Sequence, residues 1–225
     1  MGIFIAIEGG DGSGKGTQSN LLEQRLKDEG YDVLKISFPQ YGKLSAVFAE
    51  RYLNGKYGSS DQVHPELGSL AYAIDRYDAG GIVRAQLQKP KSIVIADRYV
   101  ASNLAHQGAK IEEASTRQTF YQDIMDLEYG TLGIPRPELN IVLLVPSKVA
   151  QRNVDKKAAR SYTSQKRDIH EADAKHLELA KANYEELCQL YPDEFQAVEC
   201  MANSTTMRSI ENIQTSIWQR VTTLL

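Results

Sequence analysis

Short runs of consecutive apolar residues alternate along the chain with longer stretches in which apolar residues recur every three or four positions. The short runs are typical of strands buried on both faces of a parallel sheet, and the longer stretches predict amphipathic helices. We expect strands at 3–7, 33–38, 92–96, 140–145 and 195–198, the last of them at a sheet edge. We expect helices at about 15–29, 44–53, 65–87, 100–105, 111–128, 170–190 and 208–225, and another that starts at Ser147.

This order of elements predicts an α/β fold. Strands that alternate with helices form a doubly wound parallel sheet, here of about five strands, with helices on both faces. We interpret residues 1–225 as a single domain and the polar, basic stretch 156–170 as a short lid within it. In such sheets ligands bind beyond the carboxyl ends of the strands, so the segments that follow 3–7, 33–38 and 92–96 are expected to converge.

Charge and cysteine content limit the classes of partner and the cellular location that we expect. The net charge is −3, which does not favour a general nucleic-acid or membrane-surface binder. No apolar run is long enough to span a bilayer, so we expect no membrane partner. Cys188 and Cys200 lack metal-type or redox-type spacing, which favours a reduced, cytoplasmic location.

The first predicted strand leads directly into a glycine-rich loop at the start of a helix. Gly9, Gly14 and Lys15 match the phosphate-binding P-loop pattern, in which backbone N–H groups and a helix N-terminus face phosphate oxygens. The glycine spacing does not fit a dinucleotide-binding fingerprint. We therefore predict a P-loop NTPase-type sheet that binds ATP through Gly10, Asp11, Gly12, Ser13, Gly14, Lys15, Gly16 and Thr17.

One position of this loop departs from the pattern. Gly16 replaces the Ser or Thr whose hydroxyl normally binds Mg²⁺, and Thr17 comes one residue late. Asp97 ends a buried strand, where a carboxylate suits a Mg²⁺ contact beside the P-loop. We expect Mg²⁺ as the cofactor, with Thr17 and Asp97 as candidate ligands, and Arg98 to neutralise phosphates.

Several further segments, taken with the P-loop and in this order, resemble the thymidylate kinase family. They are Phe38-Pro39, residues 70–76, Asp97-Arg98-Tyr99 and residues 132–139. The resemblance implies transfer of the γ-phosphoryl group of ATP to dTMP, giving dTDP and ADP for dTTP synthesis. It also implies Mg²⁺ dependence and a homodimer.

The resemblance assigns expected roles on the acceptor side. Asp11 would lie near Mg²⁺ and the acceptor phosphate, Tyr72 replaces a Phe that stacks on thymine, and Arg76 would donate to a base carbonyl. Arg98 would bridge the phosphates. The remaining expected contacts to the acceptor are Phe38, Tyr41, Ser102, Asn103, His106, Gln107, Asp168 and Glu171.

Basic residues of the predicted lid complete the expected catalytic set. The loop carries no Arg between Asp11 and Lys15, and the resemblance to thymidylate kinases then implies an Arg in the lid that closes over the donor phosphates. We predict that transfer depends on Lys15, Arg98, Asp11, Arg160 and Arg167.

Departures from the family pattern keep other functions open. Gln40 stands where an Arg often follows Phe-Pro, so a different nucleoside monophosphate or a deoxynucleoside remains an alternative acceptor. A regulatory P-loop ATPase is a less favoured alternative: the chain lacks the Asn-Lys-x-Asp motif of GTPases, and Arg98 replaces the Glu that motor ATPases place after the strand-terminal Asp. A nucleotide binder without activity is the third.

Overall fold

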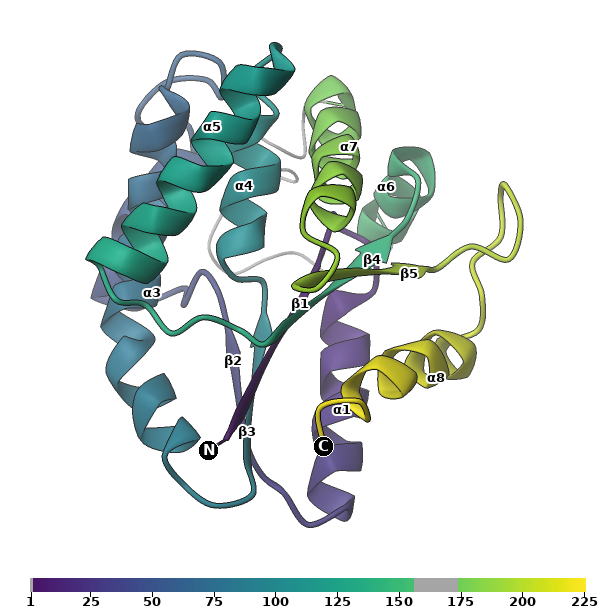
Figure 1. Ribbon diagram of the computed structural model, residues 1–225. Helices are drawn as coiled ribbons and strands as arrows, with labels where there is room; N and C mark the ends of the chain where they lie inside the picture. Colours follow the sequence, from purple (N-terminus) through teal and green to yellow (C-terminus); the bar gives the residue numbers. More distant parts are fainter. Residues whose placement is uncertain (1, 156–173) are drawn as a thin grey trace.

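A five-stranded parallel sheet forms the centre of the computed structural model, which describes residues 2–155 and 174–225 (Figure 1). Its strands are β1 (Ile3–Gly9), β2 (Asp32–Ser37), β3 (Ser92–Asp97), β4 (Leu139–Leu144) and β5 (Phe195–Glu199). They lie in the order β2-β3-β1-β4-β5, and every neighbouring pair is parallel. The predicted sheet is confirmed, with β5 at an edge.

The helices follow the predicted order. They are α1 (Lys15–Asp28), α2 (Val47–Leu53), α3 (Pro65–Leu87), α4 (Val100–Gly108), α5 (Ala114–Met125), α6 (Ser147–Asp155), α7 (Ala174–Leu190) and α8 (Ile210–Val221). A 3₁₀ turn, η1 (Leu44–Ala46), precedes α2, and a π-helix, η2 (Asp126–Thr131), follows α5. The glycine pair at 80–81 does not interrupt α3.

Several boundaries differ from the prediction by a few residues. The helix expected at 111–128 begins only at Ala114, because the Glu113 carboxylate accepts hydrogen bonds from the N–H groups of Ser115 and Thr116 and caps it there. The helix expected at 100–105 continues to Gly108.

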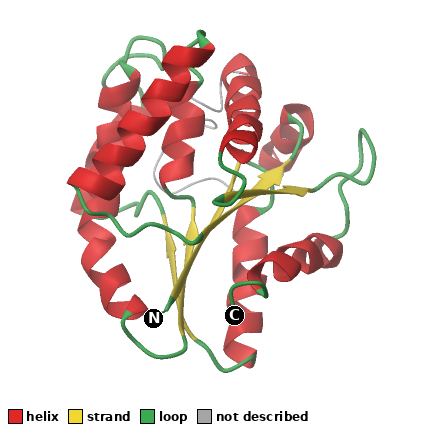
Figure 2. Ribbon diagram, in the orientation of Figure 1, coloured by secondary structure: helices red, strands yellow, loops and turns green. Residues whose placement is uncertain are grey.

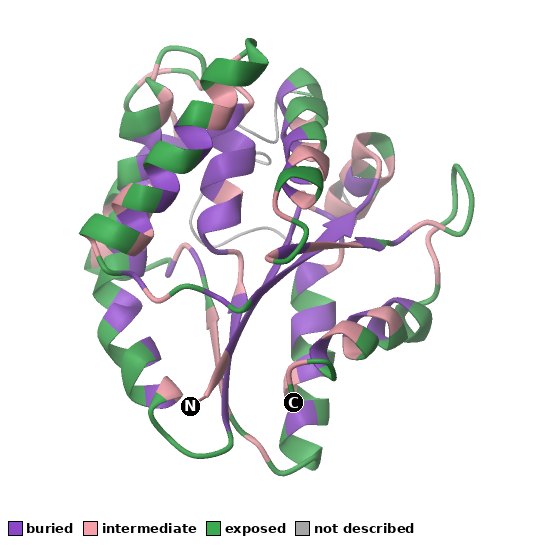
Figure 3. Cartoon of the chain, viewed as in Figure 1, coloured by how far each residue is buried: buried purple, intermediate pink, exposed green. Residues whose placement is uncertain are grey.

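Side chains of the strands alternate between two cores. In β1, Phe4 and Ala6 join one core, while Ile5 and Ile7 join the other, and all of these side chains are fully buried. Helices α3, α4, α5 and α7 cover the first face, and α1 and α8 cover the second (Figures 1 and 2). Figure 3 shows the buried strands between these layers. Burial of each large apolar side chain of these cores stabilises the folded state by about 1.5–3 kcal/mol.

The carboxyl ends of three neighbouring strands carry the candidate chemistry. Asp97 pairs in register with Ile7 of β1 and with Ser37 of β2. The glycine-rich loop, the segment after Ser37 and Arg98 therefore meet at one rim of the sheet, as predicted. No helix in the described part of the chain is long and apolar enough to cross a membrane.

Candidate active site

The glycine-rich loop between β1 and α1 is held by close backbone packing. Gly12 has φ +80°, and a Cβ there would lie 2.0 Å from the backbone oxygen of Ala150, so α6 leaves room only for glycine. Gly14, with φ +96°, turns the chain into α1, which starts at Lys15. The loop thus directs the helix N-terminus, and its partial positive charge, toward the rim.

The side chain of Lys15 folds back against the glycine-rich loop that precedes it. Its Nζ donates hydrogen bonds to the carbonyl oxygens of Gly9 at 3.0 Å and Gly10 at 2.8 Å. Burial, with the nearby Arg98 charge, lowers the pKa of Lys15 to about 8. This ammonium is therefore partly desolvated, and a bound anionic phosphate would raise its pKa again.

Arg98 ties the loop to α4. Its Nη2 lies 2.6 Å from Oδ1 of Asp11, and its Nη1 donates to the Gly9 carbonyl at 3.2 Å and to Oγ of Ser102 at 3.3 Å. Burial disfavours the guanidinium charge, but the neighbouring acidic groups, Asp11 first and then Asp97 and Glu8, together outweigh burial and raise the pKa of Arg98. Arg98 has φ +67°, an uncommon conformation for a non-glycine residue that is typical of functional positions.

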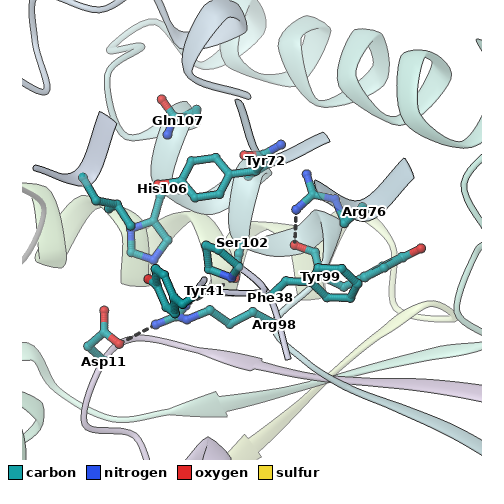
Figure 4. Close-up of a pocket in the computed structure, with 13 residues that line it drawn as sticks. Asp11, Phe38, Tyr41, Tyr72, Arg76, Arg98, Tyr99, Ser102, His106 and Gln107 are labelled. Carbon is teal, nitrogen blue, oxygen red and sulfur yellow. Dashed lines mark hydrogen bonds and ion pairs between the residues drawn. The ribbon is translucent and has the colours of Figure 1, made fainter. Parts of the chain in front are cut away.

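Two cavities open at the rim and share one wall. The donor-side cavity, about 270 Å³, is lined by loop residues, by Lys15 and by Asp97. The acceptor-side cavity, about 80 Å³, extends toward α3 and α4 (Figure 4). The residues that line both cavities are Asp11, Phe38, Pro39, Tyr41 and Arg98.

The acceptor-side cavity gathers every described residue that was predicted to contact the acceptor. These are Phe38, Tyr41, Tyr72, Arg76, Arg98, Ser102, Asn103, His106 and Gln107. Asp168, Glu171, Arg160 and Arg167 lie outside the described residues, as does the predicted lid over 156–170. Of the predicted metal ligands, Asp11 and Asp97 line the donor-side cavity, whereas Thr17 is exposed and does not line it.

Comparison with known proteins decides the family. A sequence model of the family described as thymidylate kinase matches residues 7–201. The thymidylate kinase of Mycobacterium tuberculosis is 33% identical over 187 residues, covering 82% of this chain and 85% of that protein. This chain belongs to the thymidylate kinase family.

More distant comparisons agree with this assignment. A probable thymidylate kinase of Pyrococcus horikoshii is 30% identical over 217 residues, covering 96% of this chain and 94% of that one. The solved structure of the Candida albicans thymidylate kinase superposes with a TM-score of 0.70 at 21% identity, covering 99% and 92% of the two chains. That likeness shows the shared P-loop fold. The chain is accordingly a thymidylate kinase family enzyme that phosphorylates dTMP with ATP.

Buried carboxylates that the sequence analysis did not single out support the kinase's acceptor side. Glu8, which is fully buried, accepts hydrogen bonds from the Tyr99 N–H at 2.6 Å and from Oγ of Ser102 at 2.7 Å. It also accepts from the Tyr184 hydroxyl at 3.1 Å. Burial raises the pKa of Glu8. Glu8 thereby fixes the start of α4 behind Arg98.

Asp75 of α3 holds the segment after β2. Its carboxylate accepts from the backbone N–H of Gln40 at 2.7 Å, from Nε2 of Gln40 at 3.0 Å and from Oγ of Ser45 at 2.6 Å. Gln40, which stands where the family often has an Arg, thus anchors the wall formed by Phe38 and Tyr41. Its amide is used internally.

Arg76 and Asn103 both contact a third buried carboxylate. Arg76 forms a bidentate ion pair with Glu128, with Nε and Nη2 each 2.6 Å from a carboxylate oxygen. Its Nη1 lies 3.5 Å from the Tyr99 carbonyl (Figure 4). Nδ2 of Asn103 donates to Glu128 at 2.9 Å and to the Ser69 carbonyl at 3.0 Å.

A histidine pair joins the acceptor side to α7. Nδ1 of His106 lies 3.3 Å from Nε2 of His176, and the two rings stack at 5.5 Å between centroids. Burial lowers the pKa of His106, so its ring is neutral near pH 7. This contact therefore connects the acceptor cavity to the first turn of α7.

Two of the three missed carboxylates had a common signal in the sequence. Glu8 follows an unbroken apolar strand, and Glu128 continues the spacing of apolar residues that ends at Ile124 and Met125. A charged residue at a core position is expected to be paired when it is buried. Asp75 lacks such a signal, because its partners come from the distant loop after β2.

Proposed function

We propose that phosphoryl transfer takes place where the two cavities meet, with the ATP phosphates on the glycine-rich loop and dTMP in the acceptor-side cavity. The observation that carries this is the shared wall: Arg98 and Asp11 line both cavities and contact each other at 2.6 Å. A cation at that point faces both reacting phosphates.

The chemistry then needs positioning and charge neutralisation. A phosphate monoester oxygen is already nucleophilic at neutral pH, so no general base is required for attack on the γ-phosphorus. The charge on the transferred group would be balanced by Lys15 from the loop and by Arg98 from the rim. A lid arginine, Arg160 or Arg167, would add to them and remains a prediction.

Hydrogen-bond polarity supports a thymine base in the acceptor cavity. Both N–H groups of the Asn103 amide are donated to protein acceptors, which leaves its carbonyl oxygen for a ligand. Nη1 of Arg76 has two N–H groups, of which one is directed at the Tyr99 carbonyl, so the other can donate to a ligand. Thymine offers an N3–H donor beside a carbonyl acceptor, and cytosine offers the opposite pair. Asn103 and Arg76 therefore favour thymine, with the Tyr72 ring as the expected stacking face.

We also propose that Mg²⁺ accompanies ATP in the donor-side cavity. Carboxylate oxygens are its preferred protein ligands, and Asp11 and Asp97 supply them on that cavity wall. The described residues contain no group of three or more His, Cys, Asp or Glu side chains arranged for a metal. Phosphate oxygens and water would complete the coordination, as is usual for Mg²⁺. When bound, the ion neutralises phosphate charge.

A coupled assay of ADP formation with a panel of acceptors tests this function. We expect kcat/KM for dTMP to exceed that for dCMP by about 10²-fold or more, because cytosine would leave buried polar groups unpaired. Arg76→Met should remove most of that preference. Equal turnover of dCMP would refute the base-reading role, and ADP formation that is independent of any monophosphate would favour the regulatory ATPase alternative.

A homodimer is proposed from the family, and an exposed apolar stripe on α3 supports it. Leu67, Ile74 and Tyr77 are 63%, 44% and 58% exposed on that helix, as expected for a face covered by a second copy. Sedimentation velocity measures this directly, and a monomer at micromolar concentration would contradict it.

A cytoplasmic location also remains a proposal, which the free thiols Cys188 and Cys200 support.

A further inference from the structure

Glu128 does not line the acceptor-side cavity, but it contacts Arg76 and Asn103, which do. It is fully buried, and it belongs to the π-helix η2. A π-turn in place of regular helix is frequent at functional sites. A fully buried carboxylate is unfavourable unless it is paired and hydrogen-bonded.

The local sequence fixes the position of this carboxylate. Phe120, Tyr121, Ile124 and Met125 form the buried face of α5, and Glu128 follows on the same face. The Leu132 N–H donates to the Leu127 carbonyl five residues earlier, at 2.8 Å. The Ile134 N–H donates to the Glu128 carbonyl at 2.9 Å. Both the backbone and the side chain of Glu128 are therefore held.

Glu128 is the shared partner of the two side chains to which we assign base recognition. Its Oε2 accepts from Nε of Arg76, and its Oε1 accepts both from Nη2 of Arg76 and from Nδ2 of Asn103. The second N–H of that Asn103 amide goes to the Ser69 carbonyl. With acceptors on both sides, the amide has only one satisfactory orientation.

We propose that Glu128 is a positioning residue that sets the hydrogen-bond polarity of the acceptor cavity. Because a carboxylate can only accept, it obliges Asn103 to present its carbonyl oxygen and Arg76 to present Nη1 to the base. This inference rests on the base recognition proposed above. A neutral amide at position 128 could donate to Asn103, so that the Asn103 amide turns and offers N–H groups, which suit cytosine.

A second Arg–Glu pair provides a matched control for general structural effects. Arg117 and Glu186 also form a bidentate pair, at 2.8 Å and 3.1 Å, between α5 and α7. Neither residue lines the acceptor-side cavity. Loss of the Glu186 charge should affect stability without a change in base preference.

The test compares Glu128→Gln with Glu186→Gln in steady-state assays with dTMP, dCMP and ATP. For Glu128→Gln we expect the ratio of kcat/KM for dTMP to that for dCMP to fall at least 10-fold. KM for dTMP should rise and KM for ATP should stay within twofold of wild type. Glu186→Gln should keep the wild-type ratio. A folded Glu128→Gln enzyme with the wild-type ratio would overturn the proposal.

A second variant covers the case in which Glu128→Gln does not fold. Glu128→Asp keeps the charge, but its shorter side chain cannot reach both Arg76 and Asn103. We expect a higher KM for dTMP and a reduced ratio of dTMP to dCMP. An unchanged KM and ratio in this variant would also overturn the proposal.

Failure of the underlying base recognition would look different. In that case wild type itself would show no preference for dTMP, or Arg76→Met would leave the preference intact. A wild-type preference that Arg76→Met removes and Glu128→Gln preserves would refute the role of Glu128 alone.

Discussion

The donor side and the acceptor side of this active site are built by different means. The donor side is largely one continuous segment, residues 9–17, whose backbone shape is set by glycines and by a helix N-terminus. The acceptor side is a set of side chains from separate segments. Three buried carboxylates, Glu8, Asp75 and Glu128, hold these side chains in place.

This difference separates two kinds of sensitivity. On the donor side, binding depends on backbone N–H groups and the Lys15 ammonium, so removal of that charge should slow the reaction with every acceptor. On the acceptor side, each carboxylate orients other groups, so substitution should alter the affinity or choice of acceptor and leave ATP binding intact.

The largest effect is expected for Lys15→Ala. Loss of the ammonium removes stabilisation of the transferred group, and a single such electrostatic contact accounts for about 10²–10³-fold in kcat. We expect a fall of this size with dTMP, while the circular dichroism spectrum stays that of wild type. Lys89→Ala, which removes an exposed lysine paired with Asp32, is the control and should retain full activity.

Proton uptake provides a second measurement on Lys15. Its pKa is lowered to about 8, and bound phosphate anions should raise it again. Wild type should therefore take up a fraction of a proton on binding ATP near pH 8, and affinity should fall as the pH rises through that value. Calorimetry in buffers of different ionisation enthalpy measures the uptake. The same uptake in Lys15→Ala would assign it to another group.

A moderate effect confined to the acceptor is expected for Asp75→Asn. The substitution weakens the hydrogen bonds that hold Gln40 and Ser45, and so loosens the cavity wall formed by Phe38 and Tyr41. Each bond contributes about 1 kcal/mol, so we expect KM for dTMP to rise about 10-fold. KM for ATP should not change.

The matched control for this prediction is Asp78→Asn on the same helix. Asp78 is exposed, and its substitution should leave both KM values at wild type. If Asp75→Asn raised the KM of ATP as much as that of dTMP, the two sides of the site would not be separable in this way.

The same division explains which parts of the fold and the site could be predicted from the sequence. The sheet, its order of elements and the phosphate loop follow from local patterns, because glycine spacing and apolar runs are read within short windows. On the acceptor side, residues such as Tyr72 and Gln107 could be predicted only from the resemblance to a family. Contacts between distant segments, such as Asp75 with Gln40 or Glu128 with Arg76, leave no local pattern, and only the fold reveals them.

The smallest expected effect concerns the position at which the loop departs from the P-loop pattern. A Cβ at Gly16 would meet only Oδ2 of Asp97, at 3.5 Å, which is an ordinary contact. Ser therefore fits there, and its hydroxyl would point toward the proposed Mg²⁺ site. Since Gly16 lies in the first turn of α1, replacement should also stabilise the helix by about 0.5 kcal/mol.

For Gly16→Ser we expect the Mg²⁺ concentration for half-maximal activity to fall about two- to threefold, less than 1 kcal/mol in binding free energy. Gly16→Ala separates the hydroxyl from the helix effect, because it gains the stability but offers no oxygen. If both variants shifted the Mg²⁺ dependence equally, the hydroxyl would contribute nothing. Asp11, Asp97 and the phosphates would then suffice to hold the metal without a hydroxyl at position 16.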